Sequence, residues 1–93
     1  HASVLPWLKE REVALLGSDM ASDVMPSQVE GFPGLPIHQV VVVALGVPLI
    51  DNGDFEELTR EARARNRWEF LLTLAPVRVE GGTGSPVNPI ATF

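Results

Sequence analysis

The hydrophobic positions of this chain fall into short runs of two kinds. Val4, Leu5 and Leu8 are spaced as on one face of a helix and are followed by three charged residues. This pattern predicts a short amphipathic helix over residues 4–11, which Ser3 would cap and which tolerates Pro6 in its first turn. The unbroken apolar run at 13–16, ended by Gly17, predicts a short buried strand.

No period holds from residue 18 to residue 36, where proline and glycine recur and serine and aspartate supply polar side chains. Such a composition predicts a loop. A loop of this length is uncommon inside a compact domain unless it has a function, such as forming one wall of a site.

Residues 37–45 contain four consecutive valines, which by propensity favour a strand. Pro36 suits the first position of a helix, however, and Gly46 suits the position just past its end. We therefore expect a buried helix here, followed by a strand over residues 47–50.

The second half of the chain predicts a helix, a strand, a glycine-rich turn and a final strand. Asp54 and Glu57 have the spacing of a capping box, and Phe55, Leu58 and Ala62 share one face of the helix that follows. Residues 69–79 are the longest strand candidate, and residues 89–93 form the last. The alternation of helices and strands predicts an α/β fold.

His38 and Asp51 are the candidate metal ligands, because the predicted elements bring them together. A helix over 37–45 rises about 12–13 Å, and the strand over 47–50 returns by about the same distance. Both side chains would then face one edge of the domain, where an imidazole and a carboxylate suit zinc or manganese. In one continuous strand they would lie about 40 Å apart.

A structural interpretation of the same residues stays open. A lone histidine beside an apolar run is commonly a hydrogen-bonded structural residue, and Asp-Asn-Gly-Asp before a helix is commonly a turn. Metal sites also take three or more protein ligands, and the only other histidine is His1. The acid pair Asp19 and Asp23 is interpreted as solvated or turn-forming.

Composition narrows the function classes. With 93 residues, 45% of them hydrophobic, the chain is one domain at most or a piece of one, and it has no cysteine for a disulfide or a thiolate metal site. The net charge is −5, and the arginines of residues 60–67 are interleaved with glutamates. Both features argue against binding of nucleic acid. No run approaches the roughly 20 apolar residues of a membrane span. We expect a cytoplasmic protein.

Several blocks of the sequence, in this order, resemble the C-terminal portion of the cyclase family of metal-dependent hydrolases, which includes kynurenine formamidase and isatin hydrolase. The blocks are Leu5-Pro-Trp-Leu, Leu16-Gly-Ser-Asp, Pro36-Ile-His, Trp68-Glu-Phe-Leu-Leu, Ala75-Pro and Gly84-Ser-Pro-Val-Asn-Pro. The resemblance spans nearly the whole chain, and the order of the blocks makes it specific.

The resemblance implies a swivelling β/β/α fold and a divalent ion, zinc or manganese, that activates water against a small amide or lactone. His38 matches the family's C-terminal metal-binding histidine, and Asp51 stands where the family has glutamate. Ser18, Asp19 and Ser22 would line the substrate side.

The family's His-x-x-x-His-x-Asp signature does not occur in residues 1–93. We therefore expect the chain to be the C-terminal segment of one domain. It would be active with a companion N-terminal chain or segment and would assemble into a homo-oligomer. The alternative is a non-catalytic α/β interaction module or a pseudo-enzyme fragment, in which His38 is structural.

Overall fold

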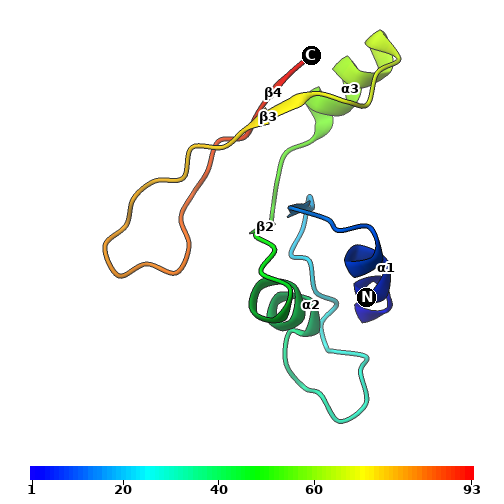
Figure 1. Ribbon diagram of the computed structural model, residues 1–93, viewed down its shortest axis with the longest axis vertical. Helices are drawn as coiled ribbons and strands as arrows, with labels where there is room; N and C mark the ends of the chain where they lie inside the picture. The colour runs from blue at the N-terminus through cyan, green and yellow to red at the C-terminus, as the bar shows by residue number, and fades with distance from the viewer. The chain divides into compact units, whose positions relative to one another are not determined.

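Short helices and strands alternate along the computed structural model, which describes all 93 residues (Figure 1). The chain divides into the units His1–Asp54 and Phe55–Phe93. The predicted order of elements is confirmed. The elements are η1 (Ala2–Val4), α1 (Leu5–Glu10), β1 (Leu16–Gly17), α2 (Pro36–His38), η2 (Gln39–Ala44), β2 (Leu49–Ile50), α3 (Glu56–Arg65), β3 (Leu71–Thr73) and β4 (Ile90–Thr92).

The N-terminal helix starts earlier than predicted. A 3₁₀ turn, η1, leads into α1, and the backbone N–H of Ser3 donates to the His1 side chain. The prediction that Ser3 caps the helix is therefore wrong, because Ser3 already lies inside the first turn. Pro6 lies at the start of α1, as predicted.

Strands β1 and β2 of the first unit pair in parallel, with Leu16 opposite Leu49 and Gly17 opposite Ile50. Both are shorter than predicted. The N–H of Val13 donates to Leu8 O at the end of α1, and Pro48 has no N–H to give. A helical crossover connects the two strands, as parallel pairing requires.

The helix predicted over residues 37–45 is confirmed as α2 continued by η2, which has π-helical hydrogen bonding. It ends at Gly46, whose φ of +67° is the left-handed conformation that glycine adopts without strain. The N–H of Val47 donates to Val41 O at 3.0 Å and turns the chain back into β2.

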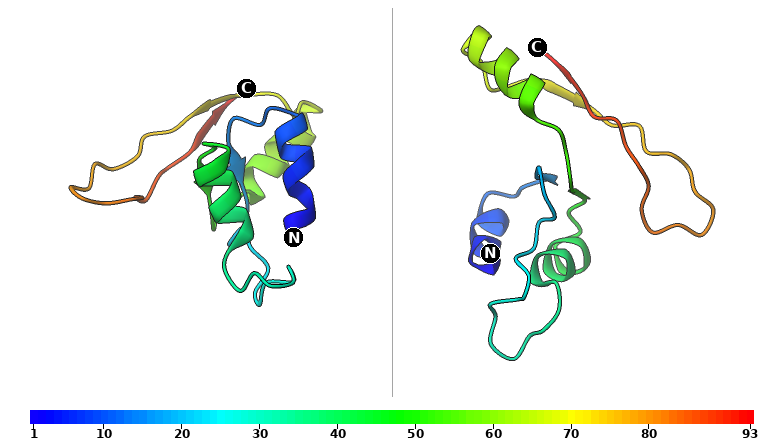
Figure 2. Two further views of the ribbon diagram at one scale, coloured as in Figure 1. Left: turned by 60° about the horizontal axis from the view of Figure 1, so that its bottom comes forward. Right: turned by 180° about the vertical axis from the view of Figure 1, so that it is seen from behind.

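The core of the first unit forms where α1, α2 and η2 meet. Leu8, Ile37 and Val41 are buried there, and further side chains pack around them. These partly buried residues are Val4, Leu5, Val13, Leu16, Val47 and Leu49. Figure 2 shows both helical segments from two further sides. Burial of Ile37 fixes the backbone position of the adjacent His38.

In the second unit, α3 begins after Phe55 rather than after Asp54, so the predicted N-cap is wrong by one residue. Ala62 is the one buried residue of this helix. Glu57 pairs with Arg60, and Glu61 with Arg65. These exposed pairs confirm the interpretation of the arginine cluster as a salt-bridged, solvated face.

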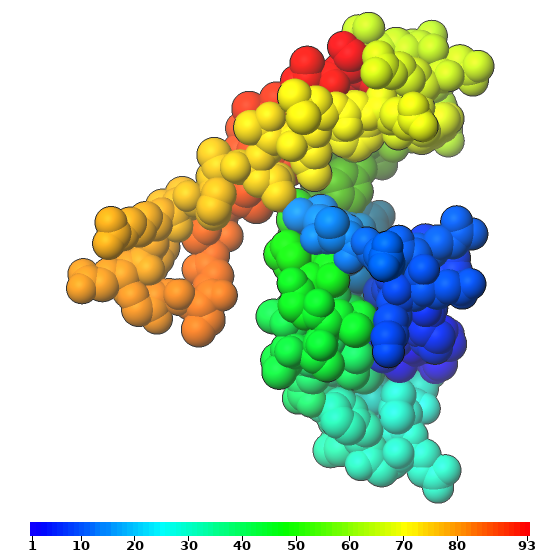
Figure 3. Space-filling model, in the orientation of Figure 1, coloured from blue at the N-terminus to red at the C-terminus, as the bar shows by residue number.

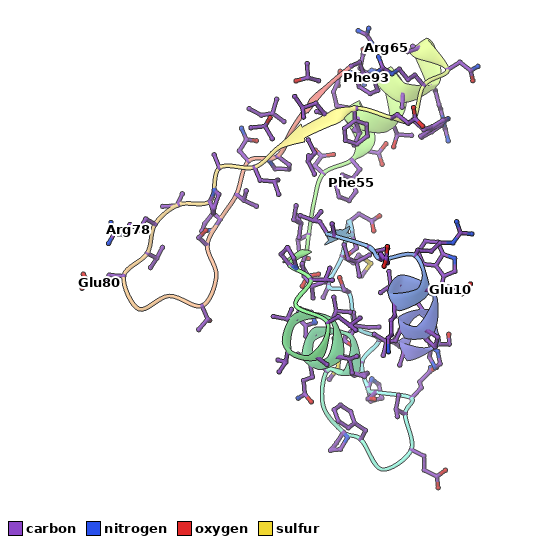
Figure 4. All side chains as sticks on the ribbon, in the orientation of Figure 1. Glu10, Phe55, Arg65, Arg78, Glu80 and Phe93 are labelled. Atoms are coloured by element: carbon purple, nitrogen blue, oxygen red, sulfur yellow. The ribbon has the colours of Figure 1, made fainter.

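Strands β3 and β4 form an antiparallel hairpin, with Leu72 opposite Ala91. The strand predicted over 69–79 is shorter because Pro89, next along the partner strand, has no N–H and interrupts the ladder. One further bridge joins Pro76 and Val87. The hairpin's loop projects as a narrow arm, coloured orange in Figure 3. Figure 4 labels Arg65 beside Phe93, consistent with the guanidinium lying 5.3 Å from the ring centroid.

Candidate functional site

The candidate site lies at the carboxyl ends of the two parallel strands. Ser18 directly follows β1, and Asp51 directly follows β2. The two ends are tied together, since Ser18 N–H donates to Ile50 O and Gly53 N–H donates to Ser18 O, both at 2.9 Å. The crossover helix runs back from this edge, so His38, in its first turn, lies beside the strand ends.

His38 lies between two carboxylates. Its Nε2 is 2.7 Å from Asp51 Oδ2, and its Nδ1 is 2.6 Å from Asp23 Oδ2. The sequence-based prediction that His38 and Asp51 share one edge of the domain is confirmed. The third member, Asp23, was not predicted.

Asp51 is held in place from the loop that follows β1. The backbone N–H and the hydroxyl of Ser22 both donate to Asp51 Oδ1, at 3.0 and 2.6 Å. The Ser22 hydroxyl also lies 3.1 Å from the Ser18 hydroxyl, which donates to Met20 O. Ser18 and Ser22, which were predicted to line the substrate side, therefore help to hold Asp51 in place.

The sequence-based interpretation of Asp23 as a solvated or turn-forming acid is wrong. Its side chain is fully buried, and it accepts the backbone N–H of Ile37 at 2.7 Å and that of His38 at 3.0 Å. These amides belong to the first turn of the helix, where no intrahelical acceptor exists. Asp19, in contrast, is exposed and takes no part in these hydrogen bonds.

His38, Asp23 and Asp51 shift the pKa values of one another. The hydrogen bond to Asp23 raises the pKa of His38, and Asp51 adds to this rise while burial opposes it. Burial alone would raise the pKa of Asp51, but the hydrogen bonds from Ser22 and His38 outweigh it and hold that pKa below its usual value. Burial is likewise outweighed at Asp23 by hydrogen bonds from His38 and Ile37, which lower its pKa.

The donor set suits a divalent cation in part. An imidazole nitrogen and a carboxylate oxygen face one another, and the remote ring nitrogen is bonded to a second carboxylate, an arrangement that recurs behind metal-bound histidines. No group of three or more His, Asp or Glu side chains in the chain is arranged to hold a metal ion. Further ligands would therefore have to come from another chain or segment.

Comparison with known proteins finds similarity among solved structures. No protein-family model matches the chain, and no curated protein matches it in sequence. Among solved structures, the crystal structure of a protein described as a novel cyclase superposes on 97% of the chain, with a TM-score of 0.77 and 32% sequence identity. The match supports a relationship to the cyclase family.

The cyclase match covers nearly all of this chain but only 28% of the cyclase. The mixed helices and strands of this chain thus correspond to one part of a cyclase fold. No helix of this chain has both the length and the apolar character needed to cross a membrane.

Proposed function

We propose that this chain is the C-terminal part of a metal-dependent hydrolase of the cyclase family. The observation that carries the proposal is the His38–Asp51 pair at the carboxyl ends of two parallel strands, in a chain that superposes on a cyclase. Carboxyl ends of parallel strands are the usual location of ligand sites in α/β proteins. The substrate class that follows from the family resemblance is a small amide or lactone.

His38 and Asp51 would supply two donors to a zinc or manganese ion. Nε2 of His38 and Oδ2 of Asp51 face one another at 2.7 Å, so these are the two atoms that would hold the ion. Asp51 is one methylene shorter than the glutamate of the family. It would hold the ion directly or through a water molecule, with its second oxygen kept on Ser22.

When bound, such a cation polarises a substrate carbonyl and makes a water molecule acidic enough to attack it near neutral pH. The residues of this chain hold the ion and orient its ligands. Ser22 prevents rotation of Asp51, and Asp23 prevents rotation of the His38 ring. The rest of the loop over residues 18–35 forms the substrate side, where Ser18 and the exposed Asp19 contact the small molecule.

The remaining ligands would come from a companion N-terminal chain or segment. The family resemblance assigns to it the His-x-x-x-His-x-Asp signature and a further histidine that acts as general acid and base. Apolar side chains left exposed here, including Val43 on η2 and Leu71 on β3, support an extensive contact with that segment and with further copies in a homo-oligomer.

A second candidate function is a non-catalytic interaction module. Both ring nitrogens of His38 already have carboxylate partners, so the histidine is satisfied without any ion. In that case the exposed apolar side chains serve partner binding alone.

The test is the metal content and amide or lactone hydrolysis of the intact assembly with His38→Ala. Loss of one ligand should lower zinc or manganese affinity at least about tenfold and abolish hydrolysis. His1→Ala is the matched control, because it removes the other, exposed histidine and should change neither quantity. Unchanged metal content and hydrolysis in His38→Ala would favour the interaction module.

A further inference from the structure

Asp23 is the one buried polar residue of the first unit. Its carboxylate is buried and accepts three N–H groups, two from the backbone of Ile37 and His38 and one from the His38 ring. The two backbone donors are permanent, because amide nitrogens do not titrate in water. They bind the ionised carboxylate, which can only accept hydrogen bonds.

An acceptor at Nδ1 decides which nitrogen of a neutral imidazole carries the proton. Asp23 is fully buried and cannot replace a ring N–H with water, whereas the side chain of Asp51 is 21% exposed and can accept water instead. In a neutral imidazole the single ring proton therefore stays on Nδ1 of His38, and Nε2 keeps its lone pair. The 2.7 Å contact between Nε2 and Asp51 Oδ2 is a hydrogen bond of the doubly protonated ring. In the neutral ring this contact has no proton, so Asp51 Oδ2 moves away and leaves the Nε2 lone pair free. The same carboxylate that caps the helix thus sets the tautomer of the histidine at the helix start.

We propose that Asp23 is a positioning residue that fixes His38 as the Nδ1–H tautomer and turns Nε2 toward Asp51. Asp23 acts through the ring, not on substrate. The consequence for a bound ion rests on the proposed function, but the tautomer does not, because it follows from hydrogen bonds within this chain.

The experiment is ¹⁵N NMR of histidine-labelled intact protein at alkaline pH with a chelator. In the wild-type protein, the signal of His38 Nδ1 should be that of a protonated ring nitrogen, and the signal of Nε2 that of a nitrogen with a free lone pair. The reverse pattern in the wild-type protein would overturn the proposal, even if every variant failed to fold.

Asp23→Asn is the informative variant. Its oxygen can still accept the Ile37 amide. Its NH₂ group then takes the place of the oxygen that faces the His38 backbone N–H and Nδ1, where it can only donate, and this reverses the preference. We expect Nε2 of His38 to give the signal of a protonated nitrogen and Nδ1 to give that of a nitrogen with a free lone pair. Ser22→Ala is the matched control, because Ser22 contacts Asp51 and not the ring, and it should leave the tautomer unchanged. A retained Nδ1–H tautomer in Asp23→Asn would contradict the proposal.

Zinc titration of the same proteins separates this proposal from the proposed function. If both are right, Asp23→Asn also weakens zinc binding at least about tenfold, the usual effect of removing such an outer partner. If the tautomer exchanges but the wild-type assembly binds no zinc, Asp23 has the positioning role and the hydrolase assignment is wrong.

Discussion

The units His1–Asp54 and Phe55–Phe93 differ in how far each covers its own apolar side chains. The first buries Leu8, Ile37 and Val41 in a common core. In the second, Ala62 is the one buried residue, and all three residues of β3 are exposed. The first unit therefore has a core that can hold a precise arrangement of side chains, whereas the hairpin of the second leaves the side chains of β3 uncovered.

The largest difference between the units should appear on truncating one aliphatic side chain in each. Ile37, 1% exposed, should cost about 2–5 kcal/mol of the free energy of unfolding when changed to alanine, because the cavity cannot refill. Leu71, 68% exposed, should cost no more than about 0.5 kcal/mol. Chemical denaturation followed by circular dichroism measures both, and equal losses would contradict the comparison.

Next in size is the loss of the buried acid. Asp23→Ala leaves the amides of Ile37 and His38 without their acceptor, which should lower the free energy of unfolding by about 1–3 kcal/mol. Asp19→Ala, in the same loop but exposed, is the matched control and should stay within about 0.5 kcal/mol. Equal effects at the two positions would show that Asp23 contributes no more to the free energy of unfolding than an exposed aspartate does.

A smaller effect should follow from pH in the chelated protein. Because Asp23 and Asp51 raise the pKa of His38, its stabilisation is complete below the unfolded pKa of about 6.5 and is lost as pH rises through the folded pKa. The free energy of unfolding should fall over that range, and His38→Gln should remove this fall. His1→Gln should keep it.

At low pH, the free energy of unfolding should change with pH in the opposite direction. The pKa values of Asp23 and Asp51 are lowered in the folded protein. Their stabilisation is present above the unfolded value of about 3.9 and is lost as pH falls through the folded values. Stability of the chelated protein should therefore be highest between these two ranges, and Asp51→Asn should reduce the acid limb. An unchanged acid limb in Asp51→Asn would contradict the assigned shift.

The smallest effect on stability, with the clearest effect on assembly, is expected from Leu71→Lys. The side chain is exposed on β3, so the free energy of unfolding should change by less than about 0.5 kcal/mol. Sedimentation velocity should nevertheless show weaker association if the hairpin is a covered face. Thr73→Lys, on the same strand and already polar, is the control. Unchanged association in Leu71→Lys would exclude β3 from any interface.

The sequence predicted the His38–Asp51 pair because local signals bounded both elements. Pro36 and Gly46 mark the ends of the helix despite the four valines between them. The short apolar run after Gly46 then has to lead the chain back toward the start of the helix. That out-and-back path brings His38 and Asp51 to one edge, whatever the details of the rest.

Asp23 could not be predicted in the same way. It lies in a loop without period, and its role depends on how that loop folds back onto the first turn of α2. The one available signal was indirect, since a helix that starts at Pro36 leaves the amides of Ile37 and His38 in need of an acceptor. Ser3 and Asp54 mislead for a related reason, because a good capping residue one or two positions away from the true cap has a similar local pattern.

We expect His38 and Asp51 to separate and to receive a divalent cation between them. Anomalous scattering from crystals of the intact assembly grown with zinc tests it most directly. We expect a zinc peak about 2.0–2.1 Å from His38 Nε2, with Asp51 turned toward it and the Nδ1–Asp23 hydrogen bond kept. Zinc bound elsewhere, with Nε2 still bonded to Asp51, would contradict the account.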